Sequence, residues 1–189
     1  TQIQLLKEHI GQQQERITIT REPGGTEEAE KIRDLLVDQN ANWSPISETL
    51  LLFAARAMHV KKVIRPALKR GETVISDRFT DSTRVYQGVA LGLGIDVVNA
   101  IKGISISDLE PDITFIMDVS PETGKLRAQK RTAETGQGDQ KYEQYDTAFH
   151  TKLRDGYLQI AKDHPNRCTV IDAEQPIEDI HNDIIRHLE

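Results

Sequence analysis

The sequence predicts an α/β fold in which a parallel sheet is covered by helices on both faces. Short β-branched runs alternate along the chain with segments whose apolar residues recur at helical spacing, and this alternation is typical of parallel sheets. The chain has 189 residues, of which 37% are hydrophobic, enough to bury one sizeable core. We therefore predict a single domain spanning 1–189.

Four short runs rich in Val, Ile and Thr predict the strands of this sheet, because β-branched residues favour extended structure. They are residues 17–20, 73–76, 113–119 and 169–171.

Helical patterns fill the intervals between these runs. A proline is well placed in the first turn of a helix, so Ser120-Pro121 marks the start of one helix and Pro176 the start of the last. The apolar spacing predicts helices over 2–10, 29–36, 47–68 and 177–188.

The first predicted helix is unusual because no strand precedes it. In a doubly wound sheet the first helix follows a strand that is often central. Loss of a central strand would leave unpaired edges, at a cost that is large against the marginal stability of a domain. We therefore expect that a strand and a loop precede Thr1 in the complete protein, and that this first central strand is absent from the sequence given.

Composition narrows the functional classes. The formal net charge of −6 argues against a nucleic-acid-binding protein, which needs a basic face, and no apolar run approaches a membrane span. The chain has a single cysteine, Cys168, which excludes a disulfide framework and suits the reducing cytoplasm. We interpret Cys168 as a small buried residue beside a strand. The six histidines lack metal-ligand spacing and are interpreted as surface or packing residues.

The first motif is Arg-Glu-Pro-Gly-Gly-Thr at 21–26. The pair Gly24-Gly25 permits positive φ and the close approach of a ligand, and Thr26 can cap the next helix. Open α/β sheets bind ligands at the carboxyl ends of their strands, which favours a binding role. The alternative is a plain strand-to-helix turn.

The second motif begins with Asp77 and Arg78, after the second predicted strand. An acid there can orient a Mg²⁺-bound water or a basic side chain, and the arginine can hold a phosphate bidentately. A surface salt bridge is the alternative. Gln87 follows, and its amide can pair with a base edge that offers both a donor and an acceptor, although it can equally be an ordinary helix residue.

Two further groups of cations complete the candidates. Arg56 lies in an apolar helix, where its charge is costly unless it is paired or faces a cleft, and neighbouring Phe53 can stack on a base or belong to the core. Arg127, Lys130 and Arg131 share one helix face and lead into a Gly-rich stretch. They indicate either a solvated face or a lid, at about 128–144, that brings charge to a transferring phosphoryl group.

In their order and spacing these motifs resemble thymidylate kinase of the bacterial type, over essentially the whole chain. The resemblance implies a P-loop kinase-like three-layer sandwich, and Mg²⁺-assisted transfer of the γ-phosphoryl group of ATP to dTMP. The segments that carry it are Arg-Glu-Pro-Gly-Gly-Thr at 21–26, Phe-Ala-Ala-Arg at 53–56, Asp-Arg-Phe-x-Asp-Ser-Thr at 77–83, Tyr-Gln-Gly at 86–88, Pro-Asp at 111–112 and Ile-Asp-Ala at 171–173.

The resemblance also implies a homodimer that packs through 47–68, and roles for single residues. The residues on the acceptor side are Arg78 and Arg33 at the dTMP phosphate, Asp77 and Glu22 near that phosphate and the metal, Arg56 and Gln87 at the thymine edge, and Phe53 and Thr83 near the base. Those on the donor side are the catalytic lid cations Arg127, Lys130 and Arg131, of which the two arginines also bind ATP, with Ala173 beside adenine and Thr1 at the end of the P-loop.

Three features depart from the family pattern. The phosphate-binding loop itself is missing, because Thr1 matches the last residue of its Ser/Thr pair. Leu52 stands where a stacking aromatic is common, with Phe53 adjacent. Lys141 replaces the usual lid arginine and keeps the charge without the bidentate fork. The alternatives are a catalytically inactive nucleotide-binding module and a kinase for another nucleoside monophosphate.

Overall fold

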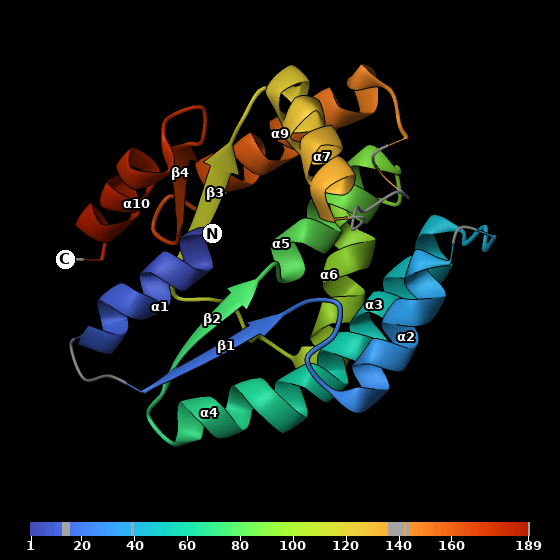
Figure 1. Ribbon diagram of the computed structural model, residues 1–189. Coiled ribbons are helices and arrows are strands. Elements are labelled where there is room, and N and C mark those ends of the chain that lie inside the picture. Colours follow the sequence, from blue (N-terminus) through green and yellow to red (C-terminus); the bar gives the residue numbers. More distant parts are fainter. Residues whose placement is uncertain (13–15, 39, 136–141, 143, 189) are drawn as a thin grey trace. The chain divides into compact units, whose positions relative to one another are not determined.

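The computed structural model describes residues 1–12, 16–38, 40–135, 142 and 144–188. The chain folds into two compact units, of which one comprises Thr1–Glu110 together with Leu188 and the other Pro111–His187. Figure 1 shows strands and helices in both units, coloured along the sequence. The predicted α/β class is confirmed, and the prediction of one domain stays a prediction.

The sheet of the first unit consists of β1 (Ile17–Arg21) and β2 (Thr73–Asp77). The two strands are parallel, with Ile17 opposite Thr73 and Arg21 opposite Asp77. Both strands therefore end at the same edge, and there the backbone N–H of Glu22 donates to the carbonyl of Asp77 at 3.0 Å. The two motifs that follow these strands in sequence are thus adjacent in space.

The long apolar helix predicted over 47–68 is present but is divided into three segments. It runs as α3 (Pro45–His59), then as the π-helix η1 (Val60–Ile64), and then as α4 (Arg65–Lys69). Pro66 explains the interruption, because proline cannot donate the i→i−4 hydrogen bond of an α-helix. In the turn before Pro66 the backbone hydrogen bonds change from i→i−4 to i→i−5, and Arg65 donates its N–H to the carbonyl of Val60.

The other helices of the first unit include three that the sequence analysis did not assign, which lie after β2. The apolar core of this unit includes Ala29, Phe53, Ala55, Val85 and Val98, each at most 1% exposed. These helices are α1 (Gln2–Gln12), α2 (Glu27–Val37), and the three unassigned ones, α5 (Thr80–Thr83), the π-helix η2 (Arg84–Ala90) and α6 (Ile95–Ile106).

The second unit is built on another parallel pair of strands. β3 (Thr114–Asp118) pairs with β4 (Cys168–Asp172), and Asp118 lies opposite Asp172. Cys168 is buried, as predicted. The helices are α7 (Pro121–Thr135), α9 (Thr147–Asp163), which the sequence analysis did not assign, and α10 (Ile177–Arg186).

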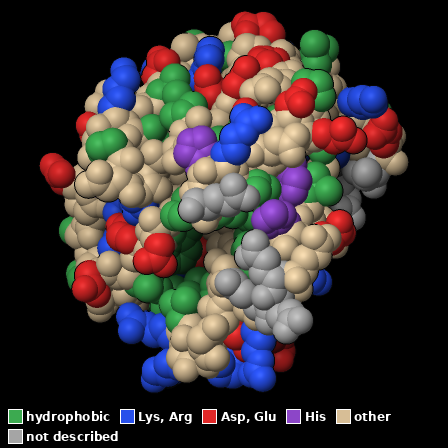
Figure 2. Space-filling model, turned by 90° about the vertical axis from the view of Figure 1, so that its left-hand side faces the viewer, with side chains coloured by type: hydrophobic (Ala, Val, Ile, Leu, Met, Phe, Trp, Pro, Cys, Tyr) green, Lys and Arg blue, Asp and Glu red, His purple; other side chains and the backbone are tan. Residues whose placement is uncertain are grey.

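The surface is charged and mixed. Figure 2 shows Lys and Arg side chains interspersed with Asp and Glu on the face that it draws. Within the described ranges, no helix has the length and apolarity that a membrane crossing requires.

Candidate functional site

The carboxylate of Glu22 is the centre of a buried polar cluster at the end of β1. Its Oε2 accepts from Nε of Arg56 at 2.5 Å, and its Oε1 lies 2.9 Å from Nδ1 of His59. Arg56 and His59 are three residues apart on α3 and therefore share one face. Nη2 of Arg56 also donates to Oγ1 of Thr83 at 3.0 Å. We call Glu22, Arg56, His59 and Thr83 the Glu22 cluster.

One nitrogen of Arg56, Nη1, is not used by the cluster. The residue is 3% exposed, and its guanidinium carbon lies 4.5 Å from the ring centroid of Phe53 and 5.4 Å from that of Phe79. Its Nη1 is buried without a hydrogen-bond partner among the described residues. An unpaired buried donor on a charged group is costly, so this nitrogen is a strong candidate for binding a ligand.

The glycine turn after β1 packs directly on the cluster. Gly25 has φ of 85°, and a Cβ atom placed on it would lie 2.7 Å from Cδ2 of His59. Only glycine therefore fits here, on conformation as well as on space. Nη1 of Arg33 donates to the carbonyl of Pro23 at 2.9 Å, and Thr26 accepts from the N–H of Ala29 at 3.1 Å. The predicted helix cap at Thr26 is confirmed.

Asp77 and Arg78 lie at the neighbouring strand end, and both are exposed. Arg78 has φ of 68°, the left-handed region that costs an L-residue roughly 1–2 kcal/mol. Oγ of Ser76 donates to the carbonyl of Arg78 at 2.8 Å and helps to hold this conformation. The guanidinium of Arg78 lies 5.3 Å from the ring centroid of Tyr86. Strained residues of this kind cluster at functional sites.

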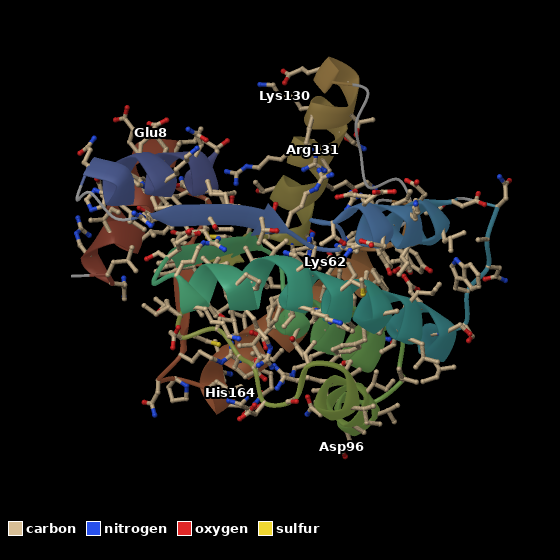
Figure 3. All side chains as sticks on the ribbon, turned by 90° about the horizontal axis from the view of Figure 1, so that it is seen from below. Glu8, Lys62, Asp96, Lys130, Arg131 and His164 are labelled. Carbon is tan, nitrogen blue, oxygen red and sulfur yellow. The ribbon has the colours of Figure 1, made fainter. Side chains whose placement is uncertain are left out.

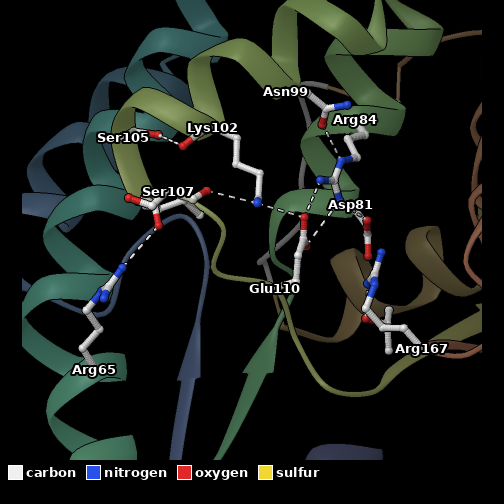
Figure 4. Close-up of polar contacts among 11 residues, drawn as sticks. Arg65, Asp81, Arg84, Asn99, Lys102, Ser105, Ser107, Glu110 and Arg167 are labelled. Atoms are coloured by element: carbon white, nitrogen blue, oxygen red, sulfur yellow. Dashed lines mark hydrogen bonds and ion pairs between the residues drawn. The ribbon is translucent and has the colours of Figure 1, made fainter.

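A network of ion pairs fixes the helices that carry Thr83 and Gln87, both of which are 2% exposed. Arg84 donates to Asp81 at 2.7 Å and to Glu110 at 2.5 Å, and Lys102 lies 3.1 Å from Glu110 (Figure 4). Burial tends to raise the pKa of Glu110, but the hydrogen bonds and charges of Arg84 and Lys102 outweigh it and lower that pKa.

Sequence reasoning missed this network, although the three-residue spacing of Asp81 and Arg84 was a usable signal. Glu110 is distant in sequence, and no local pattern identifies it as the partner of Arg84. The network matters for the site because it anchors α5 and η2 beside the Glu22 cluster.

His59 is predicted as a surface or packing residue, and the structure confirms the second alternative, because the residue is completely buried. The sequence analysis does not predict its polar contacts, which give both ring nitrogens a partner. Nε2 lies 2.5 Å from Oγ1 of Thr20, and Nδ1 lies beside Glu22. Its spacing of three residues from Arg56 on an apolar helix was the signal that could have identified it.

The two predicted metal ligands differ in exposure, because Asp77 is exposed and Glu22 is buried. The described part of the chain has no group of three or more His, Cys, Asp or Glu side chains that could hold a metal ion. Mg²⁺ at kinase sites needs only one or two carboxylates together with substrate phosphates, and the exposed Asp77 fits that requirement. Each carboxylate oxygen of Glu22 already contacts one partner, Arg56 or His59, and keeps a second lone pair that could face a metal.

The remaining predicted residues include four in the second unit. Nη1 of Arg127 donates to the carbonyl of Ala173 at 2.7 Å, which brings together two residues predicted for the ATP side. Lys130 and Arg131 project from the C-terminal half of α7 (Figure 3), and Nζ of Lys130 lies 3.9 Å from Glu134. Lys141, with 136–140 and 143 of the predicted lid, lies outside the described residues.

Thr1 belongs to the first unit and lies at the start of α1. Its carbonyl accepts from the N–H groups of Gln4 and Leu5 at 3.1 and 3.2 Å. Thr1 therefore begins the first helical turn, and its side chain has no described contact with the Glu22 cluster.

A cavity in the first unit is separate from the Glu22 cluster. It has a volume of about 500 Å³, and its lining includes Met58, Arg65 and Ile106 but no member of the cluster. Arg65 donates to the carbonyl of Ile106 at 3.3 Å across its edge (Figure 4). The motif residues at the strand ends therefore do not line this cavity.

Comparison with known proteins gives a consistent result. A family profile described as thymidylate kinase matches residues 1–184. A thymidylate kinase of Lactobacillus helveticus is 46% identical over 172 residues, covering 90% of this chain and 80% of the relative. One of Chlorobium chlorochromatii is 42% identical and covers 100% and 88%. The crystal structure of thymidylate kinase from Ehrlichia chaffeensis has a TM-score of 0.79 at 32% identity, covering 100% of this chain and 90% of that one.

Proposed function

The chain belongs to the thymidylate kinase family, and we propose that it phosphorylates dTMP to dTDP with ATP and Mg²⁺, a step toward dTTP. Family membership makes it a nucleoside-monophosphate kinase with the P-loop NTPase-like fold. The observation that carries the proposal of an acceptor site is the buried Nη1 of Arg56, which has no hydrogen-bond partner within the part of the chain that the structure describes. It lies in a buried cluster beside the two strand ends that carry Glu22 and Asp77.

Recognition of the base follows from the chemistry of Arg56 and Gln87. Arginine only donates hydrogen bonds, so Nη1 of Arg56 suits the 4-carbonyl of thymine and disfavours the 4-amino group of cytosine. The amide of Gln87 offers a donor and an acceptor and can complete the thymine edge. Thr83 holds Arg56 in place, and the ring of Phe53 lies against its guanidinium.

Binding of the acceptor phosphate is assigned to Arg78, with Arg33 as a second cation. The exposed guanidinium of Arg78 lies over the ring of Tyr86, which limits its motion, and arginine binds phosphate oxygens bidentately. Asp77 would hold Mg²⁺, and Glu22, which supports Arg56, would lie near the same phosphate. When bound, Mg²⁺ neutralises charge on the phosphates and helps to align them.

The donor side is assigned to the second unit and to Thr1. The hydrogen bond of Arg127 to the carbonyl of Ala173 supports a shared role beside ATP, with Ala173 near adenine. Lys130 and Arg131 would bring positive charge to the transferring phosphoryl group from a lid at about 128–144. Closing a lid also excludes water, so that ATP is not hydrolysed without an acceptor.

A homodimer is proposed on the exposed apolar stripe of α3. Ile46 and Leu50 are 39% and 53% exposed, and Ala54 extends the stripe at the same four-residue spacing. An apolar stripe on a helix face is stabilised when it is buried against another surface. The expected location is the cytoplasm, on the argument from the single Cys168.

The test is an assay of the complete gene product with ATP, Mg²⁺ and a panel of dTMP, dUMP, CMP, AMP and GMP, with the diphosphates resolved by chromatography. We expect dTDP to be the dominant product, and no ATP hydrolysis beyond background without an acceptor. Preferential turnover of another monophosphate would overturn the substrate assignment. Tight dTMP binding by calorimetry without any turnover would indicate the inactive nucleotide-binding module instead.

A further inference from the structure

We propose that His59 is a positioning residue that sets base recognition at the acceptor site. It holds the Glu22 carboxylate, and Glu22 in turn aims Arg56 at the base. This inference rests on the proposed function, because it concerns the dTMP side of that site. The ring of His59 is 0% exposed, and it bridges Thr20 on β1 to Glu22 after β1.

The directions of the two hydrogen bonds follow from the donor and acceptor inventory. An ionised carboxylate only accepts, so Nδ1 of His59 is the donor to Glu22. In the uncharged ring, Nε2 is then the acceptor, and the hydroxyl of Thr20 donates to it. A buried ring held at both nitrogens cannot rotate without leaving polar atoms unpaired, which is costly inside a protein. The ring is therefore a rigid support for Glu22.

The support matters because it determines how Glu22 meets Arg56. With Oε1 held by His59, the carboxylate offers Oε2 to Nε of Arg56. Thr83 takes Nη2, and Nη1 remains for a ligand. Without His59, the freed carboxylate can turn and form a bidentate pair with the guanidinium. The direction of Nη1, and with it the match to the base, would then no longer be fixed.

His59 does not take part in the phosphoryl transfer itself. It is wholly buried, and both of its nitrogens are occupied by Thr20 and Glu22. It also packs against Gly25 in the turn, so a purely structural role is the competing explanation. A test must therefore separate positioning of Glu22 from support of the fold.

The variants His59→Asn and His59→Gln make that separation. The amide nitrogen of asparagine takes the place of Nδ1 and can still donate to Glu22, whereas that of glutamine takes the place of Nε2 and contacts only Thr20. A lost hydrogen bond to a charged group corresponds to roughly a tenfold effect or more. We expect about a tenfold rise in the KM for dTMP in His59→Gln, at most about threefold in His59→Asn, and an unchanged KM for ATP in both.

A second readout is the preference for dTMP over dCMP, which is expected to fall about tenfold in His59→Gln and to persist in His59→Asn. Equal behaviour of the two variants, or parallel losses in melting temperature, dTMP affinity and ATP affinity, would overturn the inference. If neither variant folds, Thr20→Val removes only the far hydrogen bond and is expected to raise the KM for dTMP severalfold. An unchanged KM in Thr20→Val would overturn the inference in that case.

Calorimetric binding of dTMP, measured on the same proteins, separates this inference from the proposed function. A parent that binds dTMP without turnover refutes the kinase proposal, while the ratio of dTMP affinities between His59→Asn and His59→Gln still decides the role of His59. A parent that does not bind dTMP overturns both.

Discussion

Arg78 combines a charged side chain with a backbone conformation that is energetically unfavourable for an L-residue. Its φ of 68° is one that glycine adopts freely, yet the position carries an arginine. A strained conformation persists when the surroundings determine it and the side chain is needed. Here the carbonyl of Arg78 is held by Ser76, and the guanidinium projects at the strand end where the acceptor phosphate is proposed to bind.

Truncation of Arg78 is therefore expected to separate activity from stability. Both Arg78→Ala and Arg78→Gly should reduce dTMP turnover by about a hundredfold or more, because a charge that stabilises the transferring group is lost. Arg78→Gly should be about 1 kcal/mol more stable than Arg78→Ala, since only glycine relieves the left-handed strain. Chemical denaturation compares the two, and equal stabilities, or activity at the parental level, would contradict this account.

At the level of elements, helix α2 follows the glycine turn and is fixed at its start by Thr26. The hydroxyl of Thr26 accepts from the N–H of Ala29. Glu27 and Glu28 in the first turn interact favourably with the positive end of the helix dipole. The cap therefore fixes the point at which the turn ends and the helix begins.

Removal of this cap is expected to destabilise the fold modestly. Thr26→Ala should lower the free energy of unfolding by about 1 kcal/mol, while Thr26→Ser should preserve it, because serine keeps the hydroxyl. Urea denaturation followed by circular dichroism measures both. A Thr26→Ala protein as stable as the parent would show that the cap contributes nothing.

The ion network of Arg84, Glu110 and Lys102 connects η2, α6 and the end of the first unit. The pKa of Glu110 is lower in the folded state than its ordinary value of 4.5. The carboxylate therefore contributes stability above the unfolded pKa, and this contribution is lost as the pH falls through the folded pKa.

Glu110→Gln should consequently be least stable relative to the parent near neutral pH. The difference in unfolding free energy should shrink as the pH is lowered below 4.5, the ordinary pKa of the carboxyl, and through the lower folded pKa. At neutral pH we expect a difference of about 1–3 kcal/mol, because Arg84 loses a buried partner. Glu8→Gln, at an exposed position, is the matched control, and a difference for Glu110→Gln that does not depend on pH would refute the account.

On the scale of the whole molecule, exposed apolar residues suggest how the chain associates. Ile46, Leu50 and Ala54 line one side of α3, and Ile104 of α6 is 90% exposed. A charge inserted into an apolar interface is costly to bury. This stripe is therefore the natural place to test the proposed homodimer.

If the chain forms the proposed dimer, Leu50→Glu is expected to convert it into a monomer. Size-exclusion chromatography with light scattering gives the mass, and Glu8→Gln serves as a surface control that should leave it unchanged. A parent protein that is monomeric at every concentration would contradict the homodimer proposal.

The sequence by itself determined the strands, their parallel direction and the motif residues at their ends. These features depend on short-range causes: β-branched composition, apolar periodicity and glycine conformation. Strands 17–20 and 73–76 were therefore found to within a residue, and the cap at Thr26 was predicted correctly. The short helices after β2 were not found, because their stability comes from contacts with distant residues such as Glu110.

Only the tertiary structure decided what the motif residues do to one another. The role of Glu22 near the metal and the phosphate stays a prediction, and the structure adds that its two oxygens are held by Arg56 and His59. Residues 34 and 37 positions apart in sequence meet there, because the end of β1 lies beside α3, where Thr20 contacts His59. No local pattern specifies such a pairing, since it is burial that requires each charge to find its partner.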